Sequence, residues 1–307
     1  MRVLVTGGTG LIGRALVRDL LASGVQVRVV TRDPARAKKV FMDLCEYVSW
    51  DIEKRELESS AMEGVDAVVH LAGEPVAKRR WTPRRKAAIY RSRVTGAEIL
   101  GDAMASMRVE DRPKVLVSAS AVGFYGELGN FRVDETFGPG HGFLSAVCAG
   151  WEAASLEVSN LGVRACAMRI GMVLSTDGGA LPRMARVFRR GLGGHMGSGR
   201  QWLAWIHIVD LIALVRLAIE DPSIEGPINA VAPRPVTNFE FATELAHTLN
   251  AGTFLGAPGF LLRLLIGEQS ELFLTSIRAV PNLAAYHRFA FSFPELRAAL
   301  TSLLAVH

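Results

Sequence analysis

Apolar residues recur along the start of the chain with two different periods. Residues 3–5 form a short aliphatic run that predicts a strand. The apolar positions after it have helical spacing: Leu11, Ile12, Ala15, Leu16, Leu20 and Leu21. Gly24 ends this predicted helix, and residues 25–30 supply a second strand with partial alternation. The first thirty residues therefore predict a strand–loop–helix–strand unit.

The alternation of strand and helix continues over the next two hundred residues. Further strands are predicted at residues 67–71, 114–118 and 163–170. Helices are predicted at about 84–106, 146–159 and 211–219. The strand runs are almost continuously apolar, which is typical of a parallel sheet covered by helices on both faces. We therefore expect an α/β fold with a Rossmann-like, doubly wound parallel sheet.

The amino-acid composition of the chain changes after about residue 175. Glycine-rich loops follow, and the last third is dense in Leu, Phe and Pro. We expect a nucleotide-binding domain over residues 1–175 with a returning segment at about 200–232. A small C-terminal α/β lobe is expected to hold the substrate and to comprise about 176–200 and 233–307.

Three glycines separate the first strand from the first helix. Gly7 permits a tight turn, Gly10 lets the backbone approach a pyrophosphate, and Gly13 lets helix and strand pack closely. A phosphate would lie at the helix N-terminus, where N–H groups and the helix dipole favour an anion. The sequence thus predicts a dinucleotide site that is lined by Gly7, Thr9, Gly10, Leu11, Ile12 and Gly13.

The end of the second strand distinguishes the two nicotinamide dinucleotides. An Asp or Glu there normally binds the ribose 2'-hydroxyl of NAD, whereas a 2'-phosphate needs a cation. Here the strand ends in Thr31 and Arg32, which suit a phosphate and favour NADP over NAD. Asp33 leaves the NAD alternative open if the strand is one residue longer.

Composition narrows the class of protein. Half of the 307 residues are apolar and 21% are charged, which is typical of a globular protein with a substantial core. The three cysteines are odd in number and widely spaced, so we expect neither a disulfide framework nor a metal site. The first strand begins at Arg2, and the apolar stretch 259–267 is short and contains Arg263. We expect a cytoplasmic protein without a membrane partner.

The formal excess of five positive charges is local. Residues 78–93 hold eight basic residues and no acidic one, and the rest of the chain has 27 basic against 30 acidic residues. Because this segment follows a strand of the crevice, Arg80 and Arg93 can bind a cofactor phosphate or an anionic substrate. The alternative is a solvated helix face, which we expect for Arg84, Arg85 and Lys86.

A second acid-free basic stretch runs over residues 183–200 and ends in a glycine-rich loop. The loop can close over a substrate, with Arg200 as a contact, or it can be a structural crossover into the small lobe. No helix-turn-helix, RNA-recognition or zinc-finger pattern accompanies the charge, so we expect no nucleic-acid partner.

The opening T-G-x-x-G-x-x-G of residues 6–13 resembles the extended branch of the short-chain dehydrogenase/reductase superfamily. The whole chain is similar to an atypical group within it, the YfcH-type NAD-dependent epimerase/dehydratase-like family. The segments that carry this similarity are 70–75, 79–81, 92–93, 118–123, 197–202, 205–208, 232–238 and 289–296.

The resemblance implies an NADP-binding Rossmann-like domain. By analogy with the family, Leu71 and Ala72 would line the adenosine side, and Ser118 to Ser120 would lie beside the nicotinamide. Gly171 to Val173 would follow the next strand of the sheet. All of these positions are at carboxyl ends of parallel strands, where open α/β sheets bind ligands.

The chain departs from the superfamily at its acid–base pair. The usual Tyr-x-x-x-Lys positions are occupied here by Leu144 and Cys148, which cannot replace that pair in kind. Ser120 can keep its role of hydrogen-bonding a substrate oxygen, and Tyr125 is either a proton donor or only a contact. Cys148 is either an inert buried thiol or a reactive one.

His207 either faces the substrate pocket or is structural, with Asp210 as the expected N-cap of the following helix. We expect an NADP(H)-binding oxidoreductase or epimerase that acts on an unidentified small molecule, which the basic segment suggests is anionic. The alternative is a non-catalytic NADPH-binding regulatory or scaffold protein. Assembly as a homo-oligomer stays open.

Overall fold

A single large sheet forms the centre of the molecule. The computed structural model describes residues 1–252 and 256–305. The sheet order is β12-β8-β6-β5-β1-β2-β3-β4, and every pair is parallel except β3 with β4. The strands are β1 (Arg2–Thr6), β2 (Gln26–Thr31), β3 (Glu46–Asp51), β4 (Glu56–Leu57), β5 (Ala67–His70), β6 (Val115–Ala121), β8 (Arg164–Ile170) and β12 (Gly226–Ala230).

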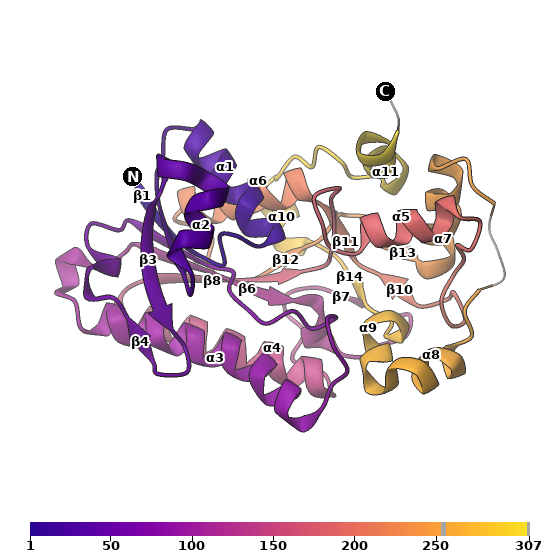
Figure 1. The fold of residues 1–307 in the computed structure, drawn as a ribbon, viewed down its shortest axis with the longest axis horizontal. Coiled ribbons are helices and arrows are strands. Elements are labelled where there is room, and N and C mark those ends of the chain that lie inside the picture. The colour runs from indigo at the N-terminus through magenta and orange to yellow at the C-terminus, as the bar shows by residue number, and fades with distance from the viewer. Residues whose placement is uncertain (253–255, 306–307) are drawn as a thin grey trace.

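Helices cover both faces of this sheet (Figure 1). One layer contains α1 (Leu11–Ala22), α2 (Pro34–Phe41) and α6 (Ile208–Glu220), and the other contains α3 (Pro83–Ala105) and α4 (Phe143–Leu156). Successive side chains of a strand point to opposite faces, so Val3 and Val5 join one core cluster and Leu4 joins the other. The predicted doubly wound parallel fold is confirmed.

The smaller end of the molecule has a core of its own. It is built from α5 (Leu181–Arg189), α7 (Asn238–Thr248) and α11 (Leu296–Leu304), around Phe188 and Phe241. Two short ladders join it to the large sheet: β9 (Met172–Leu174) with β11 (Trp205–His207), and β10 (Trp202–Leu203) with β13 (Val236–Thr237). Helices α8 (Gly259–Ile266) and α9 (Glu271–Leu274) lie along its lower edge (Figure 1).

One stretch of the last third returns to the large sheet. Strand β14 (Arg278–Ala279) pairs with β7 (Arg132–Val133), and α10 (Asn282–Tyr286) packs beside β12. Ala284 is buried in the main core. The sequence predicted a small lobe that includes all of residues 233–307. We now propose that the chain around α10 belongs to the large domain and not to this lobe.

The start of α6 differs from the prediction. His207, and not Asp210, caps this helix, because its Nδ1 accepts a hydrogen bond from the Val209 N–H at 3.1 Å. Asp210 lies in the first turn and accepts from the N–H groups of Ser292 (2.7 Å) and Phe293 (3.0 Å). Asp210 thus ties the C-terminal segment to α6, which a local sequence pattern cannot reveal.

Candidate functional site

The glycine loop between β1 and α1 has the shape that a dinucleotide phosphate requires. Gly7 has a φ of +69°, and a Cβ there would lie 2.7 Å from the Leu71 carbonyl carbon. A Cβ on Gly13 would lie 2.3 Å from the Gly7 oxygen, so helix and loop touch at this point. Gly10 is the N-cap of α1, without a side-chain cap, and the first turn contains no acidic residue. The N–H groups that begin α1 are therefore left for an anion.

The residues predicted to flank this loop lie against it. The Ala72 N–H donates to Thr6 Oγ1 (3.2 Å), and the Leu71 N–H donates to the Thr6 carbonyl (3.2 Å). A Cβ on Gly179 would lie 3.0 Å from Leu11 Cδ2 and 3.8 Å from the Val173 oxygen. Thr9 is half-buried in the loop, and Ile12 packs against the main core. The structure thus brings the predicted loop residues together with Leu71, Ala72 and Val173.

The end of β2 presents a cation. The Arg32 side chain is 72% exposed, and its one ion-pair contact is a 3.5 Å approach to Glu74 Oε1. Asp33 caps α2, since its Oδ1 accepts from the Arg36 N–H at 3.0 Å. Its own N–H donates to Thr31 Oγ1 at 3.2 Å. The Asp33 carboxylate is therefore engaged, whereas the Arg32 guanidinium is available to a phosphate.

Arg93 is a partly buried member of the basic segment. Its Nη1 donates to the carbonyls of Glu74 (3.0 Å) and Ile89 (3.2 Å), and its guanidinium carbon lies 5.2 Å from the centre of the Trp151 ring. The guanidinium also fills the space where a Gly73 side chain would be. Burial lowers the pKa of Arg93. A partly buried cation thus lies directly behind the segment that follows β5.

Two neighbours of Arg93 differ from the expected solvated face. Arg85 pairs with Glu74 Oε2 at 2.8 Å and donates to the Pro75 carbonyl. Lys86 pairs with Glu268 of the small lobe. Only Arg84 of the three is exposed as expected. The prediction was wrong for Arg85 and Lys86 because their partners are far away in the sequence or on a loop.

The three residues expected to contact substrate lie in different places. Arg80 is exposed and donates to the Leu264 carbonyl at 3.2 Å. Arg200 lines a separate surface hollow with Trp202 and Phe239. His207 is buried, stacks on Phe293 at 3.9 Å, and its Nε2 lies 3.3 Å from Ser302 Oγ. The contacts of His207 are those of a structural histidine.

The two serines at the end of β6 are both buried. The Ser118 hydroxyl accepts a hydrogen bond from Ser155 Oγ at 2.8 Å and is directed into the core. Ser120 Oγ donates to Glu152 Oε1 at 2.6 Å. A hydroxyl whose proton is held by a carboxylate offers only its lone pairs to a ligand. Ser120 can therefore accept a hydrogen bond from a substrate hydroxyl.

Glu152 belongs to a buried polar network that the sequence patterns did not reveal. Its carboxylate accepts from Arg169 Nε (3.0 Å) and Nη2 (2.9 Å), and both side chains are almost fully buried. Arg169 Nη1 donates to the Tyr125 hydroxyl at 2.9 Å, and that hydroxyl donates to Asn229 Oδ1 at 2.8 Å. One signal was available: a charged residue inside the apolar run of β8 must find a partner.

This network determines what Tyr125 can do. The ring is fully buried, and burial raises the pKa of Tyr125 to about 12. Its hydroxyl is committed on both sides, to Arg169 and to Asn229. The expectation of a loop tyrosine that reaches a ligand is not what the structure shows, because the glycines around it fold the loop inward.

The positions of the missing acid–base pair are apolar in character. Leu144 packs beside Gly123, where a Cβ would meet it at 3.5 Å. Cys148 is buried, and desolvation raises the pKa of its thiol to about 11. The thiol is therefore protonated at neutral pH, and it is a poor nucleophile there.

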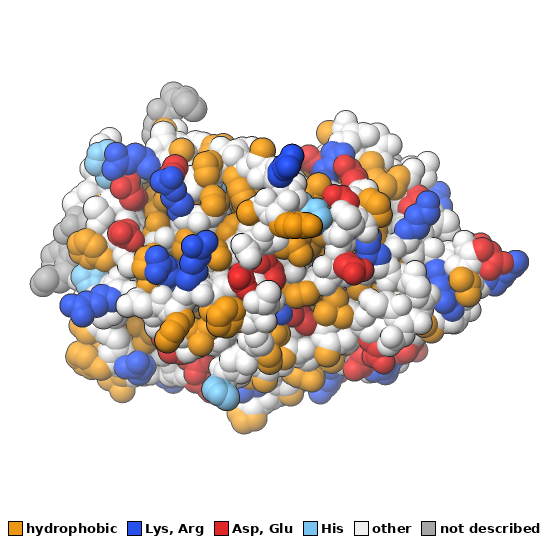
Figure 2. Space-filling view, turned by 180° about the vertical axis from the view of Figure 1, so that it is seen from behind, with side chains coloured by type: hydrophobic (Ala, Val, Ile, Leu, Met, Phe, Trp, Pro, Cys, Tyr) orange, Lys and Arg blue, Asp and Glu red, His pale blue; other side chains and the backbone are white. Residues whose placement is uncertain are grey.

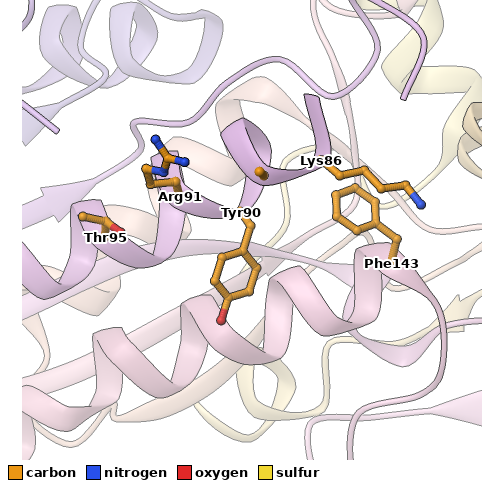
Figure 3. Close-up of a pocket in the computed structure, with 6 residues that line it drawn as sticks. Lys86, Tyr90, Arg91, Thr95 and Phe143 are labelled. Atoms are coloured by element: carbon orange, nitrogen blue, oxygen red, sulfur yellow. The ribbon is translucent and has the colours of Figure 1, made fainter. Parts of the chain in front are cut away.

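A further hollow lies on the outer surface of α3 and the start of α4 (Figure 3). Lys86 lies over the Phe143 ring at 5.0 Å, and Tyr90 points across from α3 toward α4. The hollow contains none of the predicted site residues.

No helix in the described ranges 1–252 and 256–305 combines the length and apolar character needed to cross a bilayer.

Comparisons with known proteins agree with this geometry. Residues 3–230 match the family model of the NAD dependent epimerase/dehydratase family, and residues 257–303 match a domain of unknown function, DUF1731. A chloroplastic SDR39U1 homolog of Arabidopsis thaliana is 38% identical, over 99% of this chain and 87% of the relative. The epimerase family protein Mb2239 of Mycobacterium bovis is 39% identical, over 95% and 93%.

The fold also matches a solved relative over its full length. The crystal structure of human epimerase family protein SDR39U1 (isoform 2) with NADPH superposes with a TM-score of 0.88. It is 33% identical in sequence, and 99% of each chain is covered. The glycine loop, the sheet and these matches together show that the chain belongs to the NAD-dependent epimerase/dehydratase family.

Proposed function

We propose that this protein binds NADPH in preference to NADH at the carboxyl ends of β1, β2 and β5. The observation that carries the proposal is the pair of neighbours at the end of β2: the Arg32 side chain is exposed, with only a long 3.5 Å contact to Glu74, whereas Asp33 is engaged as a helix cap. The glycine loop and the start of α1 would hold the pyrophosphate, and Thr31 with Arg32 would hold the 2'-phosphate. The human relative, crystallised with NADPH, supports the same assignment.

We further propose an oxidoreductase or epimerase activity on a small anionic molecule. When bound, the cofactor supplies hydride chemistry. Ser120 would accept a hydrogen bond from a substrate hydroxyl, and Arg93 would attract negative charge toward the segment after β5. We place the protein in the cytoplasm, which agrees with the free thiols of Cys45, Cys148 and Cys166.

Calorimetric titration tests the cofactor assignment. We expect NADPH to bind at least about tenfold more tightly than NADH, because a charge-assisted hydrogen bond to a phosphate contributes roughly 1.5–3 kcal/mol. Arg32→Ala should remove most of this preference by weakening NADPH alone. Equal binding of both cofactors by the unaltered chain, or a preference that survives in Arg32→Ala, would refute the 2'-phosphate assignment.

Two glycine substitutions, one in the proposed cofactor site and one outside it, extend that titration. Gly13→Ala should abolish the binding of both cofactors, because the new methyl group would collide with the Gly7 carbonyl. Gly101 is also inside a helix, but a Cβ there would meet only Val158, at 3.6 Å. Gly101→Ala should therefore leave both affinities unchanged.

A second candidate function is a regulatory or scaffold protein that binds NADPH without turnover. The observation that favours it is the absence of a free acid–base group at the two family positions, where Leu144 and the protonated Cys148 lie. Oxidation of NADPH, followed by absorbance against a panel of small carbonyl compounds, reveals an oxidoreductase. An epimerase consumes no cofactor overall, so its turnover is followed by separating the two epimers of each candidate substrate.

If the protein is an enzyme, the turnover of its substrate should fall at least about tenfold in Ser120→Ala. Loss of one positioned acid–base or hydrogen-bonding group usually has an effect of this size or larger. Tyr125→Phe should change the turnover little, because this hydroxyl is engaged in the core. A confirmed activity that is indifferent to Ser120→Ala would remove Ser120 from the site. NADPH binding without any turnover across the panel would favour the regulatory function.

A further inference from the structure

Helix α8 carries four large apolar side chains that face solvent. Phe260 is 71% exposed, Leu261 39%, Leu264 72% and Leu265 61%. Positions separated by one, four and five residues lie on one face of a helix, so the four form a single apolar strip. Seen from behind, the end of the molecule that contains α8 shows hydrophobic side chains with basic and acidic ones among them (Figure 2).

Exposed basic side chains border this strip. Arg263 lies on α8 itself, next to the apolar face. The turn before α3 reaches α8 through the hydrogen bond from Arg80 to the Leu264 carbonyl (3.2 Å). Lys86, in the first turns of α3, pairs with Glu268, just after the end of α8. That turn and the start of α3 expose Lys78, Arg79 and Arg84. None of these three has an acidic partner within 4.0 Å among the residues that the structure describes.

The chemistry of this surface selects one kind of partner, and it replaces the expectation, drawn from the sequence, of a protein without a membrane partner. We propose that the face made of α8 and residues 78–84 binds the surface of an anionic phospholipid bilayer, with the apolar strip among the acyl chains and the basic border on the headgroups. Leucine and phenylalanine on one side with arginine and lysine beside them is the pattern of interfacial helices. The cytoplasmic leaflet carries the complementary negative charge.

A second copy of the chain fits this face less well. A two-fold contact would bring each basic border against its own like charges, which is unfavourable. The strip also projects from the solvent-facing side of a helix, so a rigid partner would need a matching groove to cover it. A bilayer can adapt to a convex surface, so it buries the strip without such a groove.

The location of the strip connects it to the crevice. Gln269, which follows α8, donates to the Val76 carbonyl at 3.0 Å, and Val76 is in the segment between β5 and α3. Glu74 of the same segment approaches Arg32 and Arg85. A bilayer that holds α8 would therefore lie beside the edge of the proposed cofactor site. The proposal itself does not depend on the cofactor.

Flotation of the full chain with lipid vesicles tests this proposal. We expect the chain to float with vesicles of mixed phosphatidylcholine and phosphatidylglycerol at low salt, and to bind phosphatidylcholine alone at least about tenfold less. Leu264→Glu with Leu265→Glu should reduce binding at least about tenfold, since it places charge among acyl chains. Each of Lys78→Gln, Arg79→Gln and Arg84→Gln should reduce it about fivefold.

A matched variant tests whether exposed apolar residues elsewhere on the surface also contribute to vesicle binding. Leu44 and Val109 are 61% and 71% exposed but lie outside this surface, so Leu44→Glu with Val109→Glu should bind vesicles as the unaltered chain does. An unchanged unfolding midpoint shows that each variant is folded. No vesicle binding, or binding that the α8 variants do not change, overturns the proposal. Sedimentation that shows a dimer dissolved by the α8 variants, without vesicle binding, would assign the face to a second copy.

Discussion

Replacing Glu152 by alanine should lower the free energy of unfolding by about 3–5 kcal/mol, the largest stability effect that we expect from a single substitution. The variant leaves the Arg169 guanidinium buried with no carboxylate, although three of its hydrogen bonds go to Glu152. Ser120 loses its acceptor in the same change. Urea unfolding at neutral pH, followed by circular dichroism, measures this loss.

Two further variants identify the cause. Glu157 is exposed and directly follows the last residue of α4, so Glu157→Ala should change the unfolding free energy by less than about 0.5 kcal/mol. Replacing Glu152 and Arg169 together by methionine should recover most of the lost stability, because no buried charge then stays unpaired. A loss in Glu152→Ala no larger than that in Glu157→Ala would contradict the assignment of this network to the core.

The second large effect is a loss of stability in acid that depends on His70. The imidazole is completely buried between Trp50 and Trp151, and burial lowers its pKa from 6.5 to about 4. Above pH 6.5 the ring is neutral in both states, and its contribution to stability is fully present. As the pH falls from 6.5 to 4, His70 binds a proton in the unfolded chain but stays neutral in the folded chain. Stability then falls by about 1.4 kcal/mol per pH unit, or about 3 kcal/mol in all.

Urea unfolding at several pH values between 4 and 7 measures this slope. His70→Gln keeps a polar group near Thr6, whose Oγ1 lies 2.7 Å from His70 Nδ1, but removes the titration. Its stability should therefore depend much less on pH over the same interval, whatever its stability at neutral pH. His247→Gln, at an exposed position on α7, should retain the slope of the unaltered chain. Equal slopes in all three proteins would show that His70 is not the group responsible.

The parts of the structure that follow from local sequence were predictable. A run such as that of β1 is apolar because both faces of the sheet are covered, and the spacing of Gly7, Gly10 and Gly13 reflects contacts within a few residues. Arg32 also follows directly from its position at the end of β2. These features depend on neighbours in the sequence, so the pattern of residue types was sufficient.

The features that were missed depend on partners far away along the chain. Lys86 and Glu268 are separated by 182 residues, and Tyr125 and Asn229 by 104. Tyr125 was predicted to be a proton donor or a contact, but Arg169 and Asn229 hold its hydroxyl inside the molecule. Only the fold brings such pairs together, and a single sequence without its fold gives no measure of their distance.

The return of the chain around α10 to the large sheet has a consequence for how the protein is made. Val280 donates its N–H to the Val133 carbonyl at 3.0 Å, and its own carbonyl accepts from Asn229 Nδ2 at 2.9 Å. The region matched by DUF1731 thus completes the core of the region matched by the epimerase model. During synthesis these contacts cannot form until residue 280 has left the ribosome, and long-range contacts of this kind also form slowly. The two regions should therefore reach the native state as one cooperative unit, and not as two modules that fold in turn.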